Sequence, residues 1–249
     1  MITLNGLLSV PSYAGTTALL QKKTSPLNID PIRIDNFLQA RQLRGDLPQA
    51  KFFIKNLETL KIAVNPDGTG IKGVERIFNN AEERVSKGEN VSGHYFEAVL
   101  GIAFLNAGFK VKEISPKKFI EPEDKQAYIK KREIDFVVIK NGIKYYVEAK
   151  VHIGRVIESD KKNNQTKFLI EIANEFGAVP VIVLNSAENT FTEDLELKGL
   201  VQKDFSGHDI RQITRYIERY PQLHFWKVPE GRYQTAEDLD NISAKKRIS

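Results

Sequence analysis

Residues 134–150 consist of two β-prone runs separated by Asn141-Gly142, a dipeptide typical of the tight turn in a β-hairpin. A type I′ turn needs a positive φ angle at both of its central residues, and Asn and Gly tolerate this best. The runs on either side are rich in β-branched and aromatic side chains, as strands are. The sequence therefore predicts that the two runs pair as antiparallel strands.

The second run carries charged side chains on one face and apolar side chains on the other. Because side chains alternate along a strand, Glu148 and Lys150 point the same way and lie about 6.6 Å apart, at a rise of about 3.3 Å per residue. The hairpin brings Asp135, near the start of the first run, close to them. A buried carboxylate pair is costly unless a cation neutralises it, so this pattern favours a divalent metal site.

Composition excludes several kinds of chemistry. The chain has no Cys, which rules out disulfides, thiolate zinc sites and cysteine nucleophiles. It has only four His, so a His-rich metal site is not expected. The net charge of +5 favours an acidic partner, but Lys and Arg are spread through the whole chain, so charge alone does not identify nucleic acid as that partner.

The start of the chain carries no targeting signal that we recognise. It has no basic stretch, and no apolar run in the sequence is long enough to span a bilayer, so we expect neither a signal peptide nor a transmembrane helix. Met1 is the only methionine, which is compatible with a module cut from a longer protein and also with a full-length chain.

The first third of the sequence predicts a mostly helical region. Residues 1–30 are rich in Ser, Thr, Gly and Pro and predict loops and short pieces. Apolar side chains then recur at helical spacing over residues 30–63, interrupted by a Gly and a Pro, which predicts two helices. Residues 65–68 predict a turn, and residues 74–86 predict a further helix.

A strongly apolar helix is predicted next. It starts near Ser92, a candidate N-cap, and stops at Gly108. The helix is apolar almost all round, so it should be buried. Glu97 is its only formal charge, and a lone carboxylate there must find a partner or become neutral, because desolvating the charged form is expensive.

The rest of the sequence predicts alternating strands and helices. Ser159 or Asp160 is a candidate N-cap for a helix from about Lys161 to Phe176, and the apolar run after it predicts a buried strand parallel to a neighbour. The other predicted segments are a strand over 109–115, a Lys-rich connection over 116–132, a polar link over 152–160, that buried strand over 178–185, a helix over 207–220, a strand over 223–228 and a solvated tail.

This order predicts an α/β fold with a mixed central sheet flanked by helices, preceded by an N-terminal helical region. We divide the chain into three parts. Residues 1–87 are a mostly helical region with no assigned role, residues 88–190 are the core, and residues 191–249 are a C-terminal helix and strand extension with a tail.

The elements over residues 90–186 resemble the PD-(D/E)xK nuclease superfamily, whose members have the restriction-endonuclease-like fold. In that superfamily a helix contributes a Glu, a strand an Asp, the next strand a (D/E)-x-K, and the following helix often a Gln or Lys. The resemblance assigns these catalytic positions to Glu97, Asp135, Glu148-Ala149-Lys150 and Gln165. The Pro that precedes the Asp in the family is Ile134 here, which is a common departure.

The resemblance also implies a site for Mg²⁺ or Mn²⁺. The implied ligands are the carboxylates of Glu97, Asp135 and Glu148, with the carbonyl of Ala149. The metal would polarise the scissile phosphate and lower the pKa of a bound water. The Lys of the motif, Lys150, would orient or help deprotonate that water, or stabilise charge on the phosphate. The helix Gln, Gln165, would hydrogen-bond the water or a phosphate.

Several basic residues are candidates for contacts with nucleic acid. Lys161, Lys162 and Lys167 open the predicted helix, so they and the positive end of its dipole would face a phosphate, or they form an ordinary solvated face. His94, one turn before the buried Glu, would touch the site or the substrate, or it serves as a cap or a packing residue.

The activity implied by the resemblance is metal-dependent hydrolysis of phosphodiester bonds by an endonuclease, with DNA favoured as the substrate. It leaves open a restriction or junction-resolving enzyme, a toxin module of a bacterial competition system whose substrates include tRNA, and a non-catalytic nucleic-acid-binding relative. A toxin module would act in the cytoplasm of a target cell, delivered as part of a larger protein, and would be matched by a small acidic immunity protein. The sequence does not distinguish a monomer from a dimer.

Overall fold

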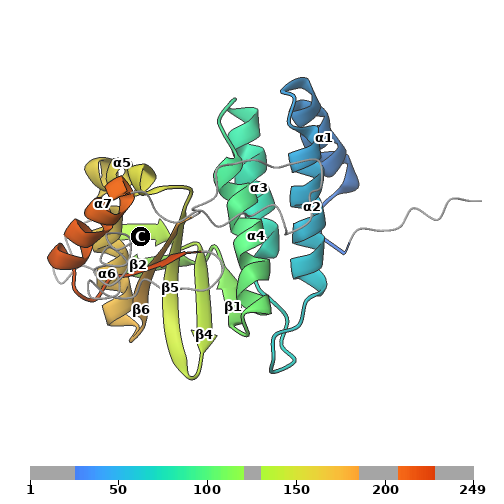
Figure 1. The fold of residues 1–249 in the computed structure, drawn as a ribbon. Helices are drawn as coiled ribbons and strands as arrows, with labels where there is room; N and C mark the ends of the chain where they lie inside the picture. Colours follow the sequence, from blue (N-terminus) through green and yellow to red (C-terminus); the bar gives the residue numbers. More distant parts are fainter. Residues whose placement is uncertain (1–25, 121–129, 185–206, 228–249) are drawn as a thin grey trace, which may run out of the picture.

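The computed structural model of the chain describes residues 26–120, 130–184 and 207–227 (Figure 1). These residues form an α/β structure with a mixed five-stranded sheet flanked by helices, as the sequence predicts. None of their helices is both long enough and apolar enough to cross a membrane. The loops predicted over most of residues 1–30 and the predicted C-terminal tail lie outside the described residues.

Four helices precede the first strand in the described part of the chain, and strands and further helices follow. The helices are α1 (Pro31–Leu43), α2 (Leu47–Ile62), α3 (Val74–Ser86), α4 (Ser92–Asn106), α5 (Ile153–Asn163), α6 (Gln165–Glu175) and α7 (Gly207–Arg219). The strands are β1 (Lys110–Ile114), β2 (Lys117–Ile120), β3 (Lys130–Glu133), β4 (Phe136–Lys140), β5 (Ile143–Lys150), β6 (Val179–Leu184) and β7 (His224–Lys227).

The central sheet has the strand order β1-β4-β5-β6-β7. Strands β1, β4 and β5 are antiparallel neighbours, whereas β5, β6 and β7 run parallel. The predicted hairpin is confirmed as β4 and β5, and Asn141 and Gly142 between them adopt φ angles of 52° and 77°. The predicted parallel pairing of the buried strand is also confirmed, since β6 lies beside β5.

Helices cover both faces of the sheet (Figure 1). Helix α4 lies on one face with α1, α2 and α3 behind it, and α5, α6 and α7 lie on the other. Alternate residues of β5 enter the two layers, so Val147 packs with α4 and Tyr146 with α6. Helix α4 is buried as predicted, and a Cβ at its Gly101 would lie 3.0 Å from Leu60 of α2. The N-terminal helices therefore share one hydrophobic core with the sheet.

The segment after β5 differs from the prediction. Residues 152–160, predicted as a polar link, lie almost entirely in α5, and the single helix predicted over 161–176 is instead the end of α5 followed by α6. Asn164 separates the two helices with left-handed backbone angles of φ 51° and ψ 43°. The predicted N-cap at Ser159 or Asp160 is wrong, because both residues lie inside α5 and Asn164 is the N-cap of α6. Asp160 still contacts the start of α6, since its Oδ1 accepts the N–H of Thr166 at 2.7 Å.

The sequence carries little sign of α5, because only Ile153 and Val156 of this helix are buried and its apolar stripe is too short to stand out as a helical period.

A second difference lies before the hairpin. Residues 116–132, predicted as a connection, contain β2 and most of β3, which pair antiparallel. Those strands contain Lys-Lys and Lys-Lys-Arg runs that do not alternate with apolar residues, so they lack the usual pattern of a strand.

The backbone at Gly73, just before α3, generates a prediction about stability. Gly73 has a φ angle of 88°, and a Cβ there would lie 2.1 Å from the Ile114 carbonyl oxygen in β1. Gly68 also has a positive φ angle, 78°, but a Cβ there would meet no atom within 4 Å. Gly68→Ala should therefore lower the free energy of unfolding by about 1 kcal/mol, and Gly73→Ala by at least about twice as much.

Thermal melts of both variants would test this, since each kcal/mol corresponds to about 2–4 °C for a chain of this size. The comparison isolates the steric contact with β1, because the two glycines share the cost of a positive φ angle. Equal losses of melting temperature would mean that α3 does not approach β1 as described.

Candidate active site

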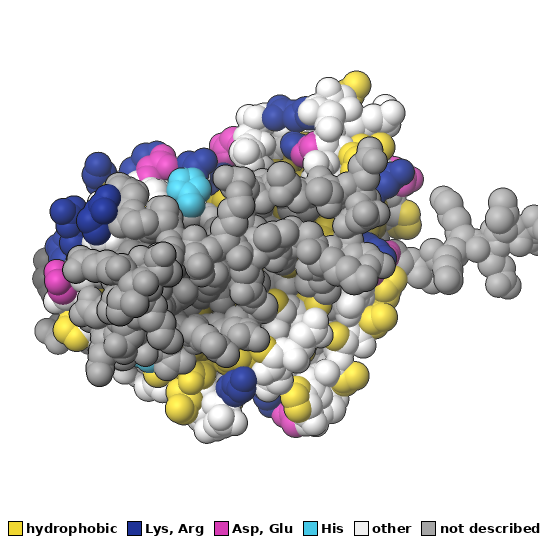
Figure 2. All heavy atoms as spheres, in the orientation of Figure 1, with side chains coloured by type: hydrophobic (Ala, Val, Ile, Leu, Met, Phe, Trp, Pro, Cys, Tyr) yellow, Lys and Arg dark blue, Asp and Glu magenta, His cyan; other side chains and the backbone are white. Residues whose placement is uncertain are grey.

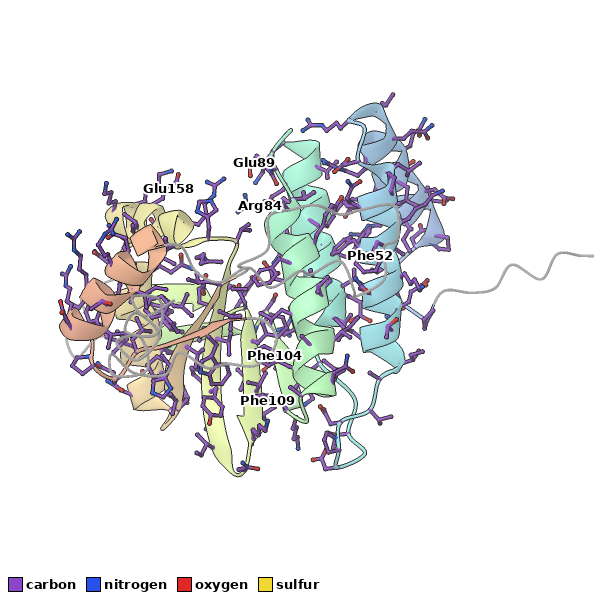
Figure 3. The ribbon with its side chains drawn as sticks, viewed as in Figure 1. Phe52, Arg84, Glu89, Phe104, Phe109 and Glu158 are labelled. Carbon is purple, nitrogen blue, oxygen red and sulfur yellow. The ribbon has the colours of Figure 1, made fainter. Side chains whose placement is uncertain are left out.

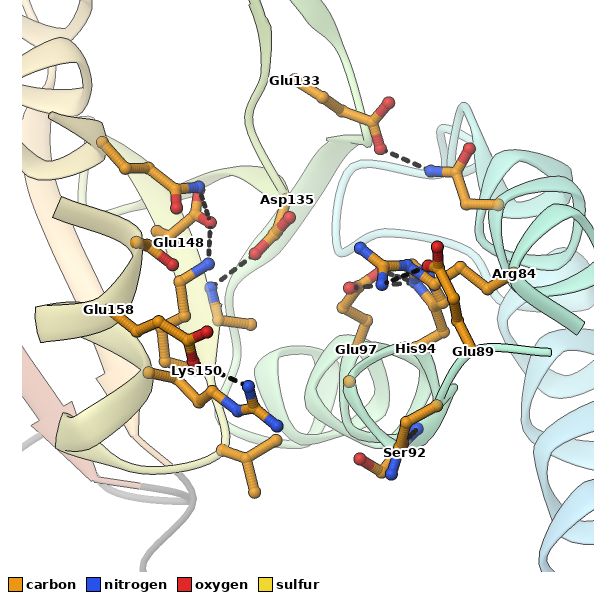
Figure 4. Close-up of a pocket in the computed structure, with 18 of the residues that line it drawn as sticks. Arg84, Glu89, Ser92, His94, Glu97, Glu133, Asp135, Glu148, Lys150 and Glu158 are labelled. Carbon is orange, nitrogen blue, oxygen red and sulfur yellow. Dashed lines mark hydrogen bonds and ion pairs between the residues drawn. The ribbon is translucent and has the colours of Figure 1, made fainter. Parts of the chain in front are cut away.

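A cleft with a volume of about 840 Å³ opens where β5 ends (Figure 4). The carboxyl ends of the parallel strands β5 and β6 meet at this edge of the sheet, and such edges commonly hold ligands in α/β proteins. The cleft brings together residues that are far apart in sequence. Those from α3, α4 and the connection between them are Asn80, Glu83, Arg84, Lys87, Glu89, Asn90, Ser92, Gly93, His94 and Glu97. Those from the sheet, α5 and α6 are Glu133, Asp135, Glu148, Ala149, Lys150, Val151, Arg155, Glu158, Ser159, Lys162, Asn163 and Gln165.

The sheet side of the cleft carries a connected set of polar groups. Glu148 is only 5% exposed, and its Oε1 accepts hydrogen bonds from Lys150 Nζ and from Gln165 Nε2. Asp135 Oδ2 accepts the backbone N–H of Ala149 at 2.6 Å. Four of the predicted catalytic side chains therefore lie together: one precedes β4, two are at the end of β5, and one is the first residue of α6.

Glu97, the fifth predicted catalytic residue, faces them from α4 (Figure 4). Glu97 is 8% exposed, and the partner that its burial requires is His94, whose Nδ1 lies 3.2 Å from the Glu97 carboxylate. The other ring nitrogen of His94, Nε2, is buried and has no hydrogen-bond partner among the described residues. His94 and Glu97 thus form a pair on the α4 wall.

The second wall also includes residues of α3 that the sequence did not single out. Arg84 and Lys87 lie at the end of α3 and pair with Glu89 and Glu83. The Nδ2 atom of Asn80 donates to Glu133 Oε1 at 2.6 Å, which connects α3 to β3. Sequence reasoning missed this wall because nothing in the local pattern of α3 indicates which sheet edge it will reach.

Helix α5 forms the rim opposite α3, so that Arg84 and Glu89 lie across the cleft from Glu158 (Figure 3). Arg155 and Lys162 both pair with Glu158, at 2.8 and 2.7 Å. These charges at positions i, i+3 and i+7 would have been a recognisable signal if residues 152–160 had been assigned to a helix.

The predicted basic contacts are arranged differently from the prediction. Lys161 and Lys162 lie in the last turn of α5, not in the first turn of the helix that follows, so the positive end of a helix dipole does not act with them. Of the three predicted lysines only Lys162 lines the cleft. Lys167 is exposed on α6, with its Nζ 3.7 Å from Glu171.

The buried charges on the sheet side perturb one another. Burial raises the pKa of Asp135 well above its ordinary value, and the nearby carboxylates of Glu148 and Glu97 raise it further. Burial also raises the pKa of Glu148, although Lys150 partly offsets this. For Lys150, burial acts to lower the pKa, but the Glu148 and Asp135 carboxylates outweigh it and raise the value. The lysine is therefore an ammonium at neutral pH, beside carboxylates that resist ionisation.

The cleft as a whole is slightly acidic. Its lining includes seven Asp and Glu residues but only five Lys and Arg residues, and each of those five cations is paired with one of the acids. A polyanion entering the cleft would therefore meet no unpaired cation among these described residues, so the cleft by itself favours cations over phosphates.

The donor set on the sheet side suits a hard divalent cation. Asp135 and Glu148 supply carboxylate oxygens, and the Ala149 carbonyl points to the same side of β5 as the Ala149 N–H that Asp135 accepts. Among the described residues no three His, Asp or Glu side chains are grouped as they would be around one ion, because Glu97 lies across the cleft. Mg²⁺ is commonly held by only one or two carboxylates together with water and substrate phosphate, so the residues present fit such an ion.

Comparison with known proteins adds no relative. No model of a protein family matches the chain, and neither a search of curated proteins nor one of solved structures gives a match. The function is therefore inferred from the residues of the cleft themselves.

The raised pKa of Asp135 generates a prediction about pH. A carboxyl group whose pKa is raised by folding binds more protons in the folded than in the unfolded chain, so its ionisation lowers stability as pH rises from about 4. Asp135→Asn removes this charge, and the amide oxygen of Asn can still accept the Ala149 N–H. The variant should melt several degrees above wild type at about pH 7.5 in EDTA, and the difference should shrink at about pH 5.

Asp35→Asn provides the matched control, because Asp35 is exposed on α1 and forms no ion pair among the described residues. It should melt with wild type at both pH values. An Asp135→Asn variant that is less stable than wild type at neutral pH would mean that the ionised carboxylate stabilises the folded chain, and that repulsion from the neighbouring carboxylates does not destabilise it.

Proposed function

We propose that the chain is a metal-dependent nuclease with a restriction-endonuclease-like core, and that the cleft at the end of β5 is its active site. The observation that carries the proposal is the convergence of Asp135, Glu148, Lys150 and Gln165 on the sheet side of one cleft, with Glu97 opposite. The family resemblance assigns these five separated positions to one site, and all five line this cleft. The order of α4, β1, the β4–β5 hairpin and β6 supports the same core.

Mg²⁺ or Mn²⁺, when bound by the Asp135 and Glu148 carboxylates with the Ala149 carbonyl, would polarise the scissile phosphate and lower the pKa of an attacking water. In this arrangement Lys150 is a charge stabiliser and not a base. Its pKa is raised by the adjacent carboxylates, so it keeps its proton at neutral pH and its ammonium can offset negative charge that develops on the phosphate. Gln165 supplies a neutral donor beside it, which can orient a phosphate oxygen or a water.

The lining of the cleft offers no surface for base stacking. Its described residues include no Phe, Tyr or Trp on which a base could stack, and the polar ones are mostly amides, hydroxyls and charges. Recognition at the scissile bond should therefore depend little on base identity.

Cleavage should require a divalent cation, because Asp135 and Glu148 are hard oxygen ligands and the cleft is acidic without one. We expect the wild-type protein to nick plasmid DNA or cut total tRNA with Mg²⁺ and to leave both intact in excess EDTA. Glu148→Ala should lose activity by about a thousandfold or more. Glu171→Ala removes a partly exposed carboxylate of α6 outside the cleft and should keep full activity. Cleavage in EDTA, or an active Glu148→Ala protein, would contradict the proposal.

Replacing Lys150 should separate catalysis from metal binding. Lys150→Met keeps most of the side-chain length and removes the ammonium, so we expect a loss of about a hundredfold or more in cleavage rate with the affinity for Mn²⁺ largely retained in calorimetry. Lys144→Met is the control, since Lys144 lies on the same face of β5 but its Nζ donates to the Phe176 carbonyl outside the cleft. Parallel loss of activity and metal affinity in Lys150→Met would show that the lysine only holds Glu148 in place.

A further inference from the structure

Helix α7 presents three arginines on one face. Arg211, Arg215 and Arg219 are spaced four residues apart, so they follow one side of the helix, and all three are exposed. The buried residues of α7, Ile213 and Ile217, lie on the opposite side and pack into the core that covers the second face of the sheet. The arginine stripe, defined as these three residues, therefore points away from the protein.

These arginines differ from the cations of the cleft in their partners. Every described Lys and Arg that lines the cleft is paired with a carboxylate, whereas no arginine of the stripe forms an ion pair among the described side chains. The Arg219 guanidinium lies 5.1 Å from the centre of the Tyr220 ring, a contact that orders the side chain and leaves its edge free to donate. Lys161, at the end of the neighbouring α5, is likewise exposed and has no acidic partner in the described part of the chain.

The stripe is attached to the helix that forms one rim of the cleft. The Tyr216 hydroxyl hydrogen-bonds the Asp160 carboxylate of α5, and burial together with this contact raises the pKa of Tyr216. Asp160 follows Ser159, which lines the cleft. Lys and Arg side chains gather over α5 and α7 on the face shown in Figure 2.

We propose that the arginine stripe of α7 is a second binding surface for the nucleic-acid backbone, outside the catalytic cleft. The proposal rests on the proposed nuclease function and adds to it where the substrate is held. The stripe extends about 12 Å along the helix axis, at 1.5 Å per residue, which matches about three to four phosphates of one strand at an axial spacing of about 3.4 Å. Guanidinium groups bind phosphate oxygens in pairs, so three arginines without acidic partners among the described residues form a surface suited to a polyanion.

Charge explains why such a surface is needed. The lining of the cleft contains more acidic than basic side chains, and its cations are already neutralised locally. It therefore cannot supply the release of counterions that drives most of the affinity of proteins for nucleic acid. Cations outside the cleft supply that contribution without weakening the metal site, because they lie on the solvent side of α7.

The salt dependence of binding tests the stripe. In a Glu148→Ala background with Mg²⁺, binding of a labelled DNA duplex is measured across a salt series. Arg211→Gln with Arg215→Gln should make the slope of log K against log salt shallower by roughly 1.8, at about 0.9 for each lost phosphate contact. The matched control is Lys51→Gln with Lys55→Gln, which removes two exposed cations at the same spacing on α2 and should leave the slope unchanged. Arg211→Lys with Arg215→Lys keeps both charges and should restore most of the slope.

Each result distinguishes phosphate binding by the stripe from a general effect of charge or a membrane role. If Arg211→Gln with Arg215→Gln and the control Lys51→Gln with Lys55→Gln change the salt slope equally, the effect is one of net charge and the proposal is wrong. A salt slope that neither double variant changes would also overturn it. If the arginine variant binds the duplex normally but loses binding to vesicles of anionic lipid, the stripe is a membrane surface and the proposal is wrong. Cleavage by wild type is scored separately, so a duplex that is bound through α7 but never hydrolysed overturns the nuclease function and supports the stripe.

Discussion

The site depends on how the buried carboxylate of Glu148, near the end of β5, is stabilised. A carboxylate with so little exposure cannot stay charged unless other groups compensate it, and here a lysine from the same strand and an amide from α6 donate to one of its oxygens. This requires β5 to lie in the middle of the sheet, where β4 on one side and β6 on the other fix its register. It also requires α6 to begin at Gln165, which the left-handed turn at Asn164 ensures.

The N-terminal helices complete the site from the other side. Helix α4 carries Glu97 and His94, and it can face β5 only because its apolar surface packs against the sheet while α2 packs against its back. Helix α3 is held at the sheet edge by polar contacts, since Arg76 Nη1 donates to the Ser115 carbonyl at 3.1 Å and to Glu113 at 3.0 Å. The region whose role the sequence left open therefore supplies one wall of the cleft, together with α4.

Local patterns predicted the elements well where a strong period or a specific turn residue was present. The Asn-Gly turn fixed the hairpin, the apolar period over residues 30–63 located α1 and α2, and a continuous apolar run ending at Gly108 located α4. The pattern failed at α5, where two buried residues gave no period and Asn164 offered no Gly or Pro to mark the break. In the site, the sheet residues were predictable because period-two alternation places Glu148 and Lys150 on one face. The contributions of Asn80, Arg84 and Lys87 were not, because they depend on how distant helices pack.

If the proposed nuclease function holds, the arrangement of charge has to reconcile binding of a polyanion with its hydrolysis. Hydrolysis at a hard-cation site requires acidic ligands, and acidic ligands repel phosphates. Paired cations at the rims of the cleft limit that repulsion locally, but they contribute little attraction because Glu158, Glu83 and Glu89 already neutralise them. Attraction then has to come from cations that no acid neutralises, placed close enough to the cleft to guide a strand into it. Helix α7 meets both conditions, since its arginines lack acidic partners among the described side chains and Tyr216 fixes it to the α5 rim. On the proposed function, placing binding on α7 and hydrolysis at the end of β5 would allow the metal site to remain acidic while the protein as a whole remains basic.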